Sequence, residues 1–515
     1  MKTLVFGIDG ASFELMNRFM EEGLLPTFQM LKERGAYGKL DSTIPPHTAP
    51  GWMSAFSGVN AGEHGIYQFW DTQSDTYVGK FMGSVDMGVP AVWEILNQAG
   101  KKTGVVNVPM THPIKKLDGF MISWPLSNTL HYCYPEKLLA EIAKHGGHYV
   151  NDLIVMCDGN IDYIDKAIEI TKKRVKTLEY LVHNYNWDFI AAVFTEIDRV
   201  SHFFWHYMDA KSPEYQSCAA ENLRNAIQNI YIETDKALAE ILKFLPKETN
   251  LIVLSDHGFG VGYVDFYVQT FLKKKGFLHT MLVTKAEEAL RKINEGSWFE
   301  YEQEGERHTV NWNETVAYMS APGSYGININ LKNRQKYGIV SEEEYESVRD
   351  KLIEELSQVI NPASGCKLFE KVVRREEVYF GNKVEKAPDL ILIPKNYGIM
   401  VSHLLKEDEI FGLPEQKGMH RPEGIFFIYN ENKKISVDTQ ESRLEDIAAT
   451  ILNIYGISIP DYMEGQVMCK LNNSVQEFCD LGSIEKKETN TIQGEAYEKG
   501  EIDSVKNRLK ALGYL

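Results

Sequence analysis

Short apolar runs, rich in β-branched and aromatic residues, recur along the chain, and each is followed by a polar or glycine-containing turn and a helical stretch. The clearest runs are Leu4–Ile8, Gly104–Val108, Phe189–Phe194, Leu251–Leu254, Asp389–Ile393 and Gly424–Tyr429. Strands that alternate with helices predict an α/β fold with a mostly parallel central sheet flanked by helices. Because ligands of such sheets bind at the carboxyl ends of the strands, the residues after each run are the first candidates for a functional site.

The composition is that of a globular, acidic protein. Of the 515 residues 43% are hydrophobic, and the formal net charge is −17. Duplex nucleic acid and anionic membranes would repel this charge, so we expect neither as a partner. The 6 cysteines form no CxxC pair, which argues against a zinc ribbon or a disulfide framework. The first apolar run is too short for a signal peptide, and no run approaches the roughly 18 residues of a membrane span. We therefore expect no membrane span and a cytoplasmic location.

The character of the sequence changes along the chain. The predicted division is a core of residues 1–265 and 376–472, an inserted cap subdomain of residues 266–375, a polar linker of residues 473–500 and a C-terminal helix of residues 501–515. Long charged helical stretches, such as Lys285–Asn294 and Glu342–Ile360, distinguish the cap. The last stretch spaces Val505, Leu509 and Leu512 as in a short amphipathic helix that docks on the body.

Side chains that can bind metals follow two of the apolar runs. Asp9 ends the first run and precedes Gly10, an arrangement that is equally typical of a turn. Asp198 and His202 stand four residues apart after Phe189–Phe194, so a helix there would place both on one face. His206 extends the same stripe, and we expect it to pack or to support the ligands.

Two further histidines lie near strand ends. Asp256 and His257 follow an almost wholly apolar strand, and both can bind a metal only in a tight loop, which Gly258 and Gly260 permit. A purely structural Asp-His pair is the alternative. His420 lies in a loop just before the run Gly424–Tyr429, where a single histidine is more often a surface residue than a ligand.

Three prolines surround Thr48 in the loop of residues 43–52, which leads into a predicted helix. A rigid loop at a helix N-terminus presents a hydroxyl to an anion, because the free N–H groups there attract phosphate. Taken alone, the segment also fits a turn with Thr48 as the helix N-cap. Together, however, the three Asp, the three His and Thr48 form a nitrogen and oxygen ligand set that is large enough for two divalent cations. Three imidazoles with carboxylates suit zinc, with manganese as the alternative.

The order of these motifs resembles the alkaline phosphatase superfamily, and within it the type I phosphodiesterase and nucleotide pyrophosphatase branch. The matching segments are Asp9-Gly10, Thr48-Ala49-Pro50, Ser57-Gly58, Glu63-His64-Gly65-Ile66, Asp198 with His202, Ser255-Asp256-His257-Gly258 and His420. They span roughly residues 1 to 430. The chain is also similar to a prokaryotic group of predicted phosphohydrolases or phosphomutases, through its Thr-Ile-Pro-Pro, Asn-Val-Pro-Met, Ala-Pro-Asp-Leu and Leu-Gly-Tyr-Leu segments.

The resemblance implies an alkaline phosphatase-like fold, two metals and a threonine nucleophile. One metal would be bound by Asp9, Thr48, Asp256 and His257, and the other by Asp198, His202 and His420. His64 belongs to a motif that looks structural in the family. The expected reaction is hydrolysis of a small-molecule phosphate mono- or diester through a phosphothreonine intermediate on Thr48. A phosphomutase or phosphotransferase of the same superfamily is an alternative, as is a non-catalytic, metal-containing binding protein.

Two departures from the family pattern narrow the substrate. Nucleotide-cleaving relatives have an Asn about 21 residues after the nucleophile, where this chain has Phe69; Gln68 and Asn107 are candidates to replace it. Sulfatases need a convertible Cys or Ser and an Arg four residues later, where this chain has Thr48 and Trp52, which argues against sulfatase activity. The aromatic residues Trp52, Phe69 and Trp70 are interpreted as core rather than as a binding wall.

Overall fold

The computed structural model describes most of the chain, and its residues form two compact units. The described residues are 1–77, 79–153, 160–283, 299–303, 306–433, 435–437, 442–470, 496–497 and 499–511. Unit 1 consists of Met1–Phe69, Met82–Val261 and Lys417–Leu515, and unit 2 consists of Trp70–Phe81 and Gly262–Gln416. Each unit is therefore assembled from stretches that are separated in the sequence.

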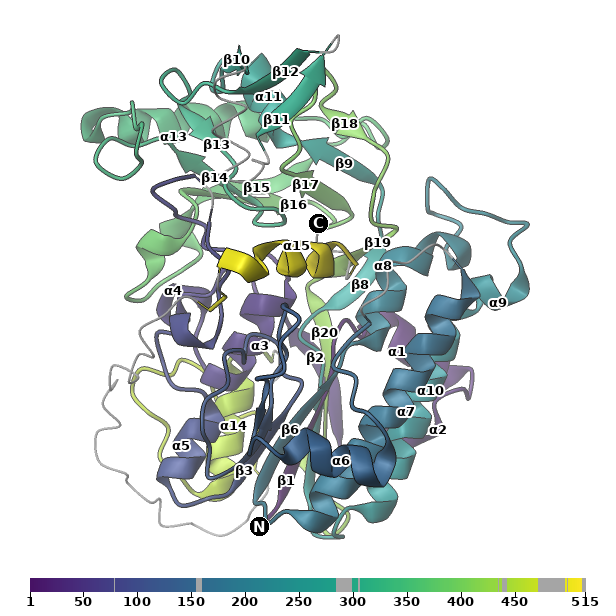
Figure 1. The fold of residues 1–515 in the computed structure, drawn as a ribbon. Helices are drawn as coiled ribbons and strands as arrows, with labels where there is room; N and C mark the ends of the chain where they lie inside the picture. The colour runs from purple at the N-terminus through teal and green to yellow at the C-terminus, as the bar shows by residue number, and fades with distance from the viewer. Residues whose placement is uncertain are drawn as a thin grey trace. The chain divides into compact units, whose positions relative to one another are not determined.

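Unit 1 contains an eight-stranded central sheet (Figure 1). Its strands lie in the order β2 (Ala36–Asp41), β20 (Glu423–Tyr429), β7 (Asn250–Leu254), β1 (Thr3–Ile8), β6 (Phe189–Phe194), β3 (Thr103–Val106), β4 (Gly119–Ile122) and β5 (Cys133–Tyr134). The run from β7 to β4 pairs in parallel, whereas β20 is antiparallel to both of its neighbours and β5 is antiparallel to β4. This arrangement confirms the predicted α/β fold with a mostly parallel central sheet.

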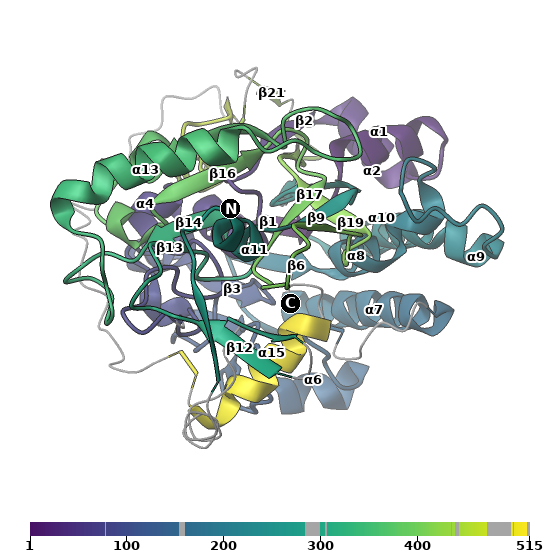
Figure 2. The same cartoon turned by 90° about the horizontal axis from the view of Figure 1, so that it is seen from above.

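Helices cover both faces of this sheet. They are α1 (Phe13–Glu21), α2 (Pro26–Arg34), α3 (Thr48–Ser57), α4 (Ala61–His64), α5 (Val92–Gln98), α6 (Leu138–Gly146), α7 (Ile161–Asn184), α8 (Glu196–Met208), α9 (Glu221–Arg224), α10 (Ala226–Phe244), α14 (Asp446–Tyr455) and α15 (Ile502–Ala511). In Figure 1, α7, α8 and α10 lie on one face, and α3, α5 and α14 lie on the other; Figure 2 shows α7, α8 and α10 side by side from above. Every residue of β1, β6 and β7 is buried, which explains why these strands are apolar on both faces.

The neighbouring strands β7, β1 and β6 end at one edge of the sheet. Gly7 pairs with Leu254, and Ile8 pairs with Phe194. Beyond the strands, the backbone N–H of Asp9 donates to the carbonyl of Phe194 at 2.9 Å, and the N–H of Asp198 donates to the carbonyl of Asp9 at 3.1 Å. The first residues after β1 and β6 are thus held together by backbone hydrogen bonds.

Unit 2 contains small sheets and, among its described residues, two α-helices. The four-stranded sheet has the order β13 (Ala317–Tyr318), β14 (Gly326–Ile329), β16 (Leu390–Pro394) and β15 (Phe369–Arg374). One three-stranded sheet has the order β17 (Ile399–Ser402), β9 (Val264–Tyr267) and β18 (Phe411–Gly412). Another has the order β10 (Thr280–Leu282), β12 (Glu306–Val310) and β11 (Glu300–Gln303). The helices are α11 (Val268–Lys274) and α13 (Glu342–Ser357). The run Asp389–Ile393, which the sequence placed in the central sheet, is β16 of this unit, because it pairs antiparallel with β14 and β15.

A buried carboxylate joins the strands of unit 2. Asp389, just before β16, accepts hydrogen bonds at Oδ1 from Arg334 at 2.7 Å, Tyr345 at 2.6 Å and Arg375 at 3.1 Å. Its Oδ2 accepts from the N–H of Ile329 at 2.7 Å and from Arg334 at 2.5 Å. The Ala-Pro-Asp-Leu segment therefore has a structural role here: its carboxylate ties two arginines and a tyrosine to the sheet.

The predicted cap, residues 266–375, falls within unit 2, which extends further to residues 70–81 and 376–416. The extension follows from strand pairing, since β16 and β17 pair with strands of the predicted cap or its border. The stretch Glu342–Ile360 contains α13, whereas Lys285–Asn294 and residues 473–495 of the predicted linker lie outside the described residues.

The C-terminal stretch packs on unit 1. Helix α15 buries Val505 and Leu509, as its spacing predicted, while Leu512 lies outside the described residues. Arg508 Nη2 donates to Asn151 Oδ1 at 3.1 Å.

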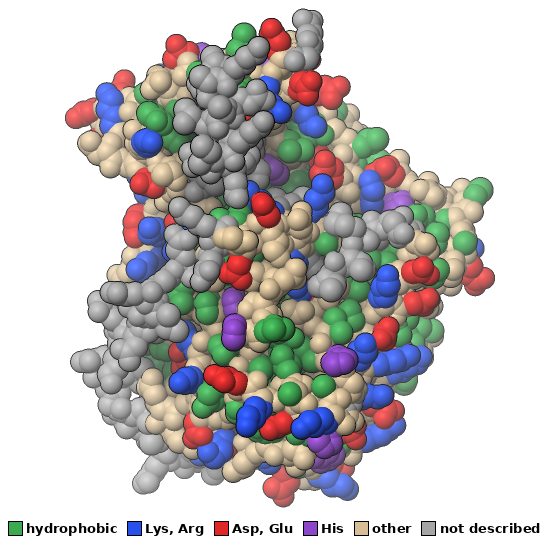
Figure 3. Space-filling model, viewed as in Figure 1, with side chains coloured by type: hydrophobic (Ala, Val, Ile, Leu, Met, Phe, Trp, Pro, Cys, Tyr) green, Lys and Arg blue, Asp and Glu red, His purple; other side chains and the backbone are tan. Residues whose placement is uncertain are grey.

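Charged side chains of both signs are interspersed over the described part of the face in Figure 3. The longest described helix, α7, has 24 residues and carries Lys, Arg, Asp and Glu along its length. Among the residues that the structure describes, no helix is long and apolar enough to cross a membrane.

Candidate metal centre and active site

Six acidic and imidazole side chains meet beyond the carboxyl ends of β1, β6 and β7. They are Asp9, Asp198, His202, Asp256, His257 and His420, the metal ligands that the sequence predicted together with Thr48. Asp9 follows β1, Asp198 and His202 lie on α8 after β6, and Asp256 and His257 follow β7. His420 comes from β19 (Gly418–Arg421), which pairs antiparallel with β8 (Gly258–Val261) and sets His420 opposite Phe259.

The loops that carry these side chains are held tightly. Ser255 Oγ donates to the carbonyl of His257 at 2.6 Å and accepts from the N–H of Ala11 at 2.8 Å. Gly10 has φ +77°, and a Cβ at this position would lie 3.0 Å from the Cα of Asp198. The close approach of the loops after β1 and β6 therefore requires glycine here.

Thr48 is the first residue of α3, and the residue before it caps the helix. His47 Nδ1 accepts from the N–H of Ala49 at 3.1 Å, so the interpretation of Thr48 as the N-cap is wrong. The Thr48 hydroxyl instead faces the ligand cluster, with Oγ1 3.2 Å from His257 Nε2 and 3.4 Å from Asp9 Oδ1. Its position at the positive end of the helix dipole favours an anion beside it.

One group of ligands surrounds His257. Its Nε2 lies 3.4 Å from Asp9 Oδ1 and 3.4 Å from Asp256 Oδ2. The N–H of Gly10 donates to Asp256 Oδ1 at 3.3 Å, which leaves Oδ2 turned toward the histidine. Together with the Thr48 hydroxyl, these atoms make a compact oxygen and nitrogen site.

A second group surrounds Asp198. Its Oδ1 lies 3.3 Å from His420 Nε2, 3.4 Å from His202 Nε2 and 3.8 Å from His257 Nε2. The Nε2 atoms of His202 and His420 are 3.1 Å apart. The His257 and His420 rings stack with centroids 3.7 Å apart, so the two groups are contiguous.

Backbone carbonyls fix the protonation of all three imidazoles. The Nδ1 atoms of His202, His257 and His420 lie 3.2, 3.1 and 3.2 Å from the carbonyl oxygens of Gly418, Gly258 and Pro46. A carbonyl only accepts hydrogen bonds, so each Nδ1 carries a proton and each ring turns its Nε2 inward. Lone pairs on two nitrogens 3.1 Å apart repel each other unless a proton or a metal cation lies with them.

The carboxylates carry an excess of buried negative charge. Burial, and then the neighbouring carboxylates, raise the pKa of Asp9 and of Asp256 well above the usual range. Asp9 Oδ2 and Asp256 Oδ2 are buried and accept no hydrogen bond. The pKa of Asp198 is held well below its usual value, since His202 and Arg199 outweigh the opposing effect of burial.

These donors fit divalent cations. Tetrahedral coordination with bonds of about 2.0–2.2 Å places neighbouring ligand atoms about 3.3–3.6 Å apart. The ligand atoms of both groups are separated by similar distances, 3.1 to 3.8 Å. The cluster is therefore suited to hold two ions. Its imidazole Nε2 atoms point inward, it contains buried carboxylate oxygens that lack partners, and its ligand atoms have the separations that a cation requires.

Sequence reasoning missed two charged residues behind this cluster. Arg199 is fully buried on α8 and donates to Asp198 Oδ2. Asp152, also buried, binds the same guanidinium. Arg199 could have been found from the sequence, because it is adjacent to the predicted ligand Asp198. Nothing in the sequence around Asp152 distinguishes that residue.

Other singled-out residues lie outside the ligand set. His206 is buried with its ring against Tyr207, at 3.9 Å between centroids. His64 Nδ1 accepts from the N–H of Ile66, and its Nε2 lies 3.1 Å from Ser54 Oγ on α3, a structural arrangement. Trp52, Phe69 and Trp70 are buried, in agreement with their interpretation as core.

The two candidates to replace the family's Asn differ sharply. The Asn107 amide already has partners on both sides, because its Nδ2 donates to the carbonyl of Val193 at 3.2 Å and its Oδ1 accepts from Tyr149 at 3.1 Å. Gln68 is buried and its Oε1 accepts from the N–H of Phe69, but its Nε2 has no hydrogen-bond partner. Of the two, Gln68 is the one whose amide nitrogen is buried without a hydrogen-bond partner.

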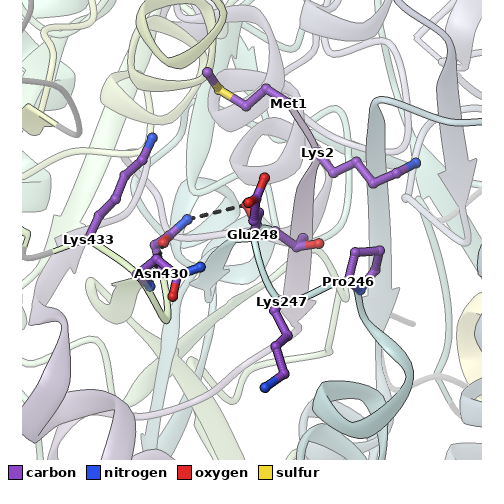
Figure 4. A pocket seen from close by; sticks show the side chains of 9 residues that line it. Met1, Lys2, Pro246, Lys247, Glu248, Asn430 and Lys433 are labelled. Atoms are coloured by element: carbon purple, nitrogen blue, oxygen red, sulfur yellow. Dashed lines mark hydrogen bonds between the residues drawn. The ribbon is translucent and has the colours of Figure 1, made fainter.

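A separate hollow lies at the amino end of β1 (Figure 4). It has a volume of about 690 Å³ and is lined by Met1, Lys2, Pro246, Lys247, Glu248, Thr249, Asn430, Asn432 and Lys433. Asn430 Nδ2 donates to the Glu248 carbonyl at 3.4 Å and to Asn250 Oδ1 at 2.8 Å. The hollow lies at the opposite end of β1 from Asp9 and contains none of the candidate ligands.

The chain matches a family model and several solved structures. Residues 3–422 match the family described as type I phosphodiesterase / nucleotide pyrophosphatase, and no curated protein matches the chain. Phosphonoacetate hydrolase from Sinorhizobium meliloti 1021 is 14% identical, with a TM-score of 0.53 over 87% of this chain and 94% of that one. Alkaline phosphatase PafA is 12% identical, with a TM-score of 0.52 over 90% and 97%. Human ectonucleotide pyrophosphatase/phosphodiesterase 5 is 13% identical, with a TM-score of 0.50 over 90% and 97%. These structures share the fold.

Proposed function

Because this chain belongs to the type I phosphodiesterase/nucleotide pyrophosphatase family, and thus to the phosphoester hydrolases of the alkaline phosphatase superfamily, we propose that it cleaves small phosphate mono- or diesters through a phosphothreonine intermediate on Thr48. The observation that carries the proposal is the position of the Thr48 hydroxyl, 3.2 Å from the His257 nitrogen that both ligand groups share. A hydroxyl at this point is next to the ligand cluster and at a helix N-terminus, where an anionic substrate is favoured.

Two divalent cations complete the proposal. Asp9, Thr48, Asp256 and His257 would hold one, and Asp198, His202 and His420 the other. When bound, such a pair lowers the pKa of a coordinated hydroxyl and stabilises charge on the attacking and leaving oxygens. The three imidazoles favour zinc, and the carboxylates leave manganese as the alternative.

The residues of the chain then have distinct tasks. Thr48 Oγ attacks phosphorus as the bond to the leaving oxygen breaks, and water later releases the phosphoryl group from Thr48. The carbonyls of Gly418, Gly258 and Pro46 keep the histidines in the tautomer that presents Nε2. Gln68 Nε2, buried and without a partner, is the candidate donor for a phosphoryl oxygen in place of the Asn that the family has at Phe69.

The test is Thr48→Ala, with Thr48→Ser as the matched variant. We expect alanine to lower turnover of an aryl phosphate ester by about 10⁴-fold or more, since the covalent route is lost. Serine keeps the hydroxyl and should retain measurable turnover. Serine should also keep bound metal and the melting temperature unchanged, whereas alanine, which removes one of the proposed ligands, is assayed at saturating zinc. Turnover that survives in Thr48→Ala would remove Thr48 as the nucleophile.

A substrate panel separates the alternatives. Among structures of the same fold, phosphonoacetate hydrolase was solved with phosphonoacetate and murine ectonucleotide pyrophosphatase/phosphodiesterase 5 with AMP. The panel should therefore hold an aryl monoester, an aryl diester, an aryl ester of a nucleotide, phosphonoacetate and a sulfate ester. Phosphate transfer to an added alcohol would identify a mutase or transferase. Two bound ions without any turnover would indicate a binding protein.

A further inference from the structure

A buried arginine connects the candidate metal centre to a second carboxylate behind it. Arg199 is 0% exposed, and its Nη1 donates to Asp198 Oδ2. On its other edge, Nε lies 3.3 Å from Asp152 Oδ1 and Nη2 lies 3.1 Å from Asp152 Oδ2, a two-point contact. The guanidinium is thus held flat between two buried carboxylates.

Asp152 is itself fixed by further donors. Trp124 Nε1 donates to Oδ2 at 2.7 Å, Thr195 Oγ1 donates to Oδ1 at 3.1 Å, and the N–H of Leu153 donates to Oδ1 at 2.8 Å. Both oxygens of Asp152 are therefore occupied, and neither is available to a ligand. Asp152, unlike Asp9 or Asp256, therefore accepts hydrogen bonds at both of its carboxylate oxygens.

The contact also determines how Asp198 is presented. Because Arg199 occupies Oδ2, only Oδ1 faces the nitrogens of His202 and His420, at 3.4 and 3.3 Å. Without the guanidinium, the carboxylate could rotate or offer both oxygens to one ion. A planar, permanently charged group that binds through several N–H donors suits this task better than an ammonium does.

We propose, on the basis of the proposed two-metal function, that Arg199, held by Asp152, is a positioning residue that fixes Asp198 for one of the two cations. Arg199 touches neither substrate nor cation in this proposal. It acts by restricting Asp198 to single-oxygen coordination, because its guanidinium occupies Oδ2. Loss of such an outer partner typically weakens metal binding or activity about 10–100-fold.

A second arginine in the same region gives a matched control. Arg174, on α7, is 1% exposed, and its Nη1 lies 2.7 Å from Glu196 Oε1, on the same helix as Asp198. It also donates to the carbonyl of Asn151, next to Asp152. Arg174 is therefore also buried and paired with a carboxylate, but that carboxylate is not a candidate metal ligand.

The experiment compares Arg199→Met, Arg199→Lys and Arg174→Met in the full-length protein. Zinc dissociation constants and stoichiometry are measured after chelation, together with turnover of an aryl phosphate ester across zinc concentrations. For Arg199→Met we expect one of two ions to bind about 10–100-fold more weakly, with turnover recovering as zinc is raised. Arg199→Lys should lie between this variant and the wild type. Arg174→Met should lose stability but keep both ions.

A double variant guards against misfolding. Arg199→Met leaves Asp152 buried without its counter-charge, and this variant could fail to fold for that reason. In that case the double variant, Arg199→Met with Asp152→Asn, is used because it removes both charges together. Wild-type zinc binding in a folded Arg199 variant would overturn the proposal, as would an equal loss of zinc in Arg174→Met. Failure of the underlying function is distinguishable, because the wild-type protein itself would then bind no stoichiometric zinc or turn over no ester.

Discussion

The two units each bury carboxylates completely, but they treat them in opposite ways. Asp389 in unit 2 accepts hydrogen bonds from two arginines, a tyrosine and a backbone N–H. Asp9 and Asp256 in unit 1 are equally buried, yet each keeps one oxygen without a partner. An unpaired buried charge is costly, so the second arrangement favours a bound proton or cation, whereas the first is complete within the protein.

This difference separates a structural carboxylate from a functional one better than burial does. Asp389 directly precedes an apolar strand and Asp256 comes just after one, and both have neighbours typical of turns. Only the supply of donors around them differs. The comparison predicts that substitutions at the two positions have opposite consequences for stability and for activity.

The largest effect is expected from Asp256→Asn. Loss of a ligand charge should reduce phosphate ester turnover by about three orders of magnitude or more, since the cations supply several kcal/mol of charge stabilisation. The metal-free variant should be as stable as the wild type or more stable, by about 1 kcal/mol, because a crowded negative charge is removed. Turnover assays and chemical unfolding after chelation measure both. If Asp256→Asn unfolded readily but stayed active with zinc, Asp256 would be a structural carboxylate rather than a metal ligand.

Asp389→Asn should act on stability alone. Arg334 and Arg375 lose their buried counter-charge, so the free energy of unfolding of unit 2 should fall by about 3–5 kcal/mol. Hydrogen exchange of peptides from residues 316–331 and 369–394 would report this loss, while zinc binding by unit 1 should persist. Tyr345→Phe, which removes one hydrogen bond to the same carboxylate, is the milder control at about 1 kcal/mol. Unchanged exchange in Asp389→Asn would show that the carboxylate does not hold the sheet together.

The smallest effect concerns pH. Because the pKa values of Asp9 and Asp256 are raised on folding, the folded metal-free protein binds protons more tightly than the unfolded chain. This contribution to stability is complete below about pH 4 and is lost as the pH rises through the raised values. Cations compete with these protons, so zinc should raise the melting temperature more at pH 8 than at pH 5, by about 2–4 °C. An equal increase at both pH values would argue against these carboxylates as ligands.

Much of unit 1 was predictable from the sequence. The strands β1, β6 and β7 are apolar along their whole length, because they are buried on both faces, and such runs leave a clear signal. The i, i+4 spacing of Asp198 and His202 also predicted their common helix face. The common location of Asp9, Asp198, Asp256 and His257 followed from the rule that strands in a parallel sheet end at one edge.

Unit 2 was harder because its strands are short and partly exposed. β12 reads Glu-Arg-His-Thr-Val and β15 reads Phe-Glu-Lys-Val-Val-Arg, patterns that give little apolar contrast. The strand β16 is apolar enough to resemble a central strand, and only its partners show that it belongs elsewhere. Asp152 could not be recognised from the sequence for a related reason, because its role depends on Arg199, 47 positions away.

The antiparallel pairing of β8 with β19 has a consequence for the order of synthesis and folding. Val261 pairs with Gly418, so the chain leaves unit 1 and returns to it at adjacent points, with residues 262–416 made in between. At roughly 5–20 residues per second, the ribosome needs at least several seconds for that stretch. Until then, the nascent chain holds five of the six Asp and His ligands but lacks His420. The candidate site can therefore be completed only after the whole of residues 262–416 has been made and His420 has followed.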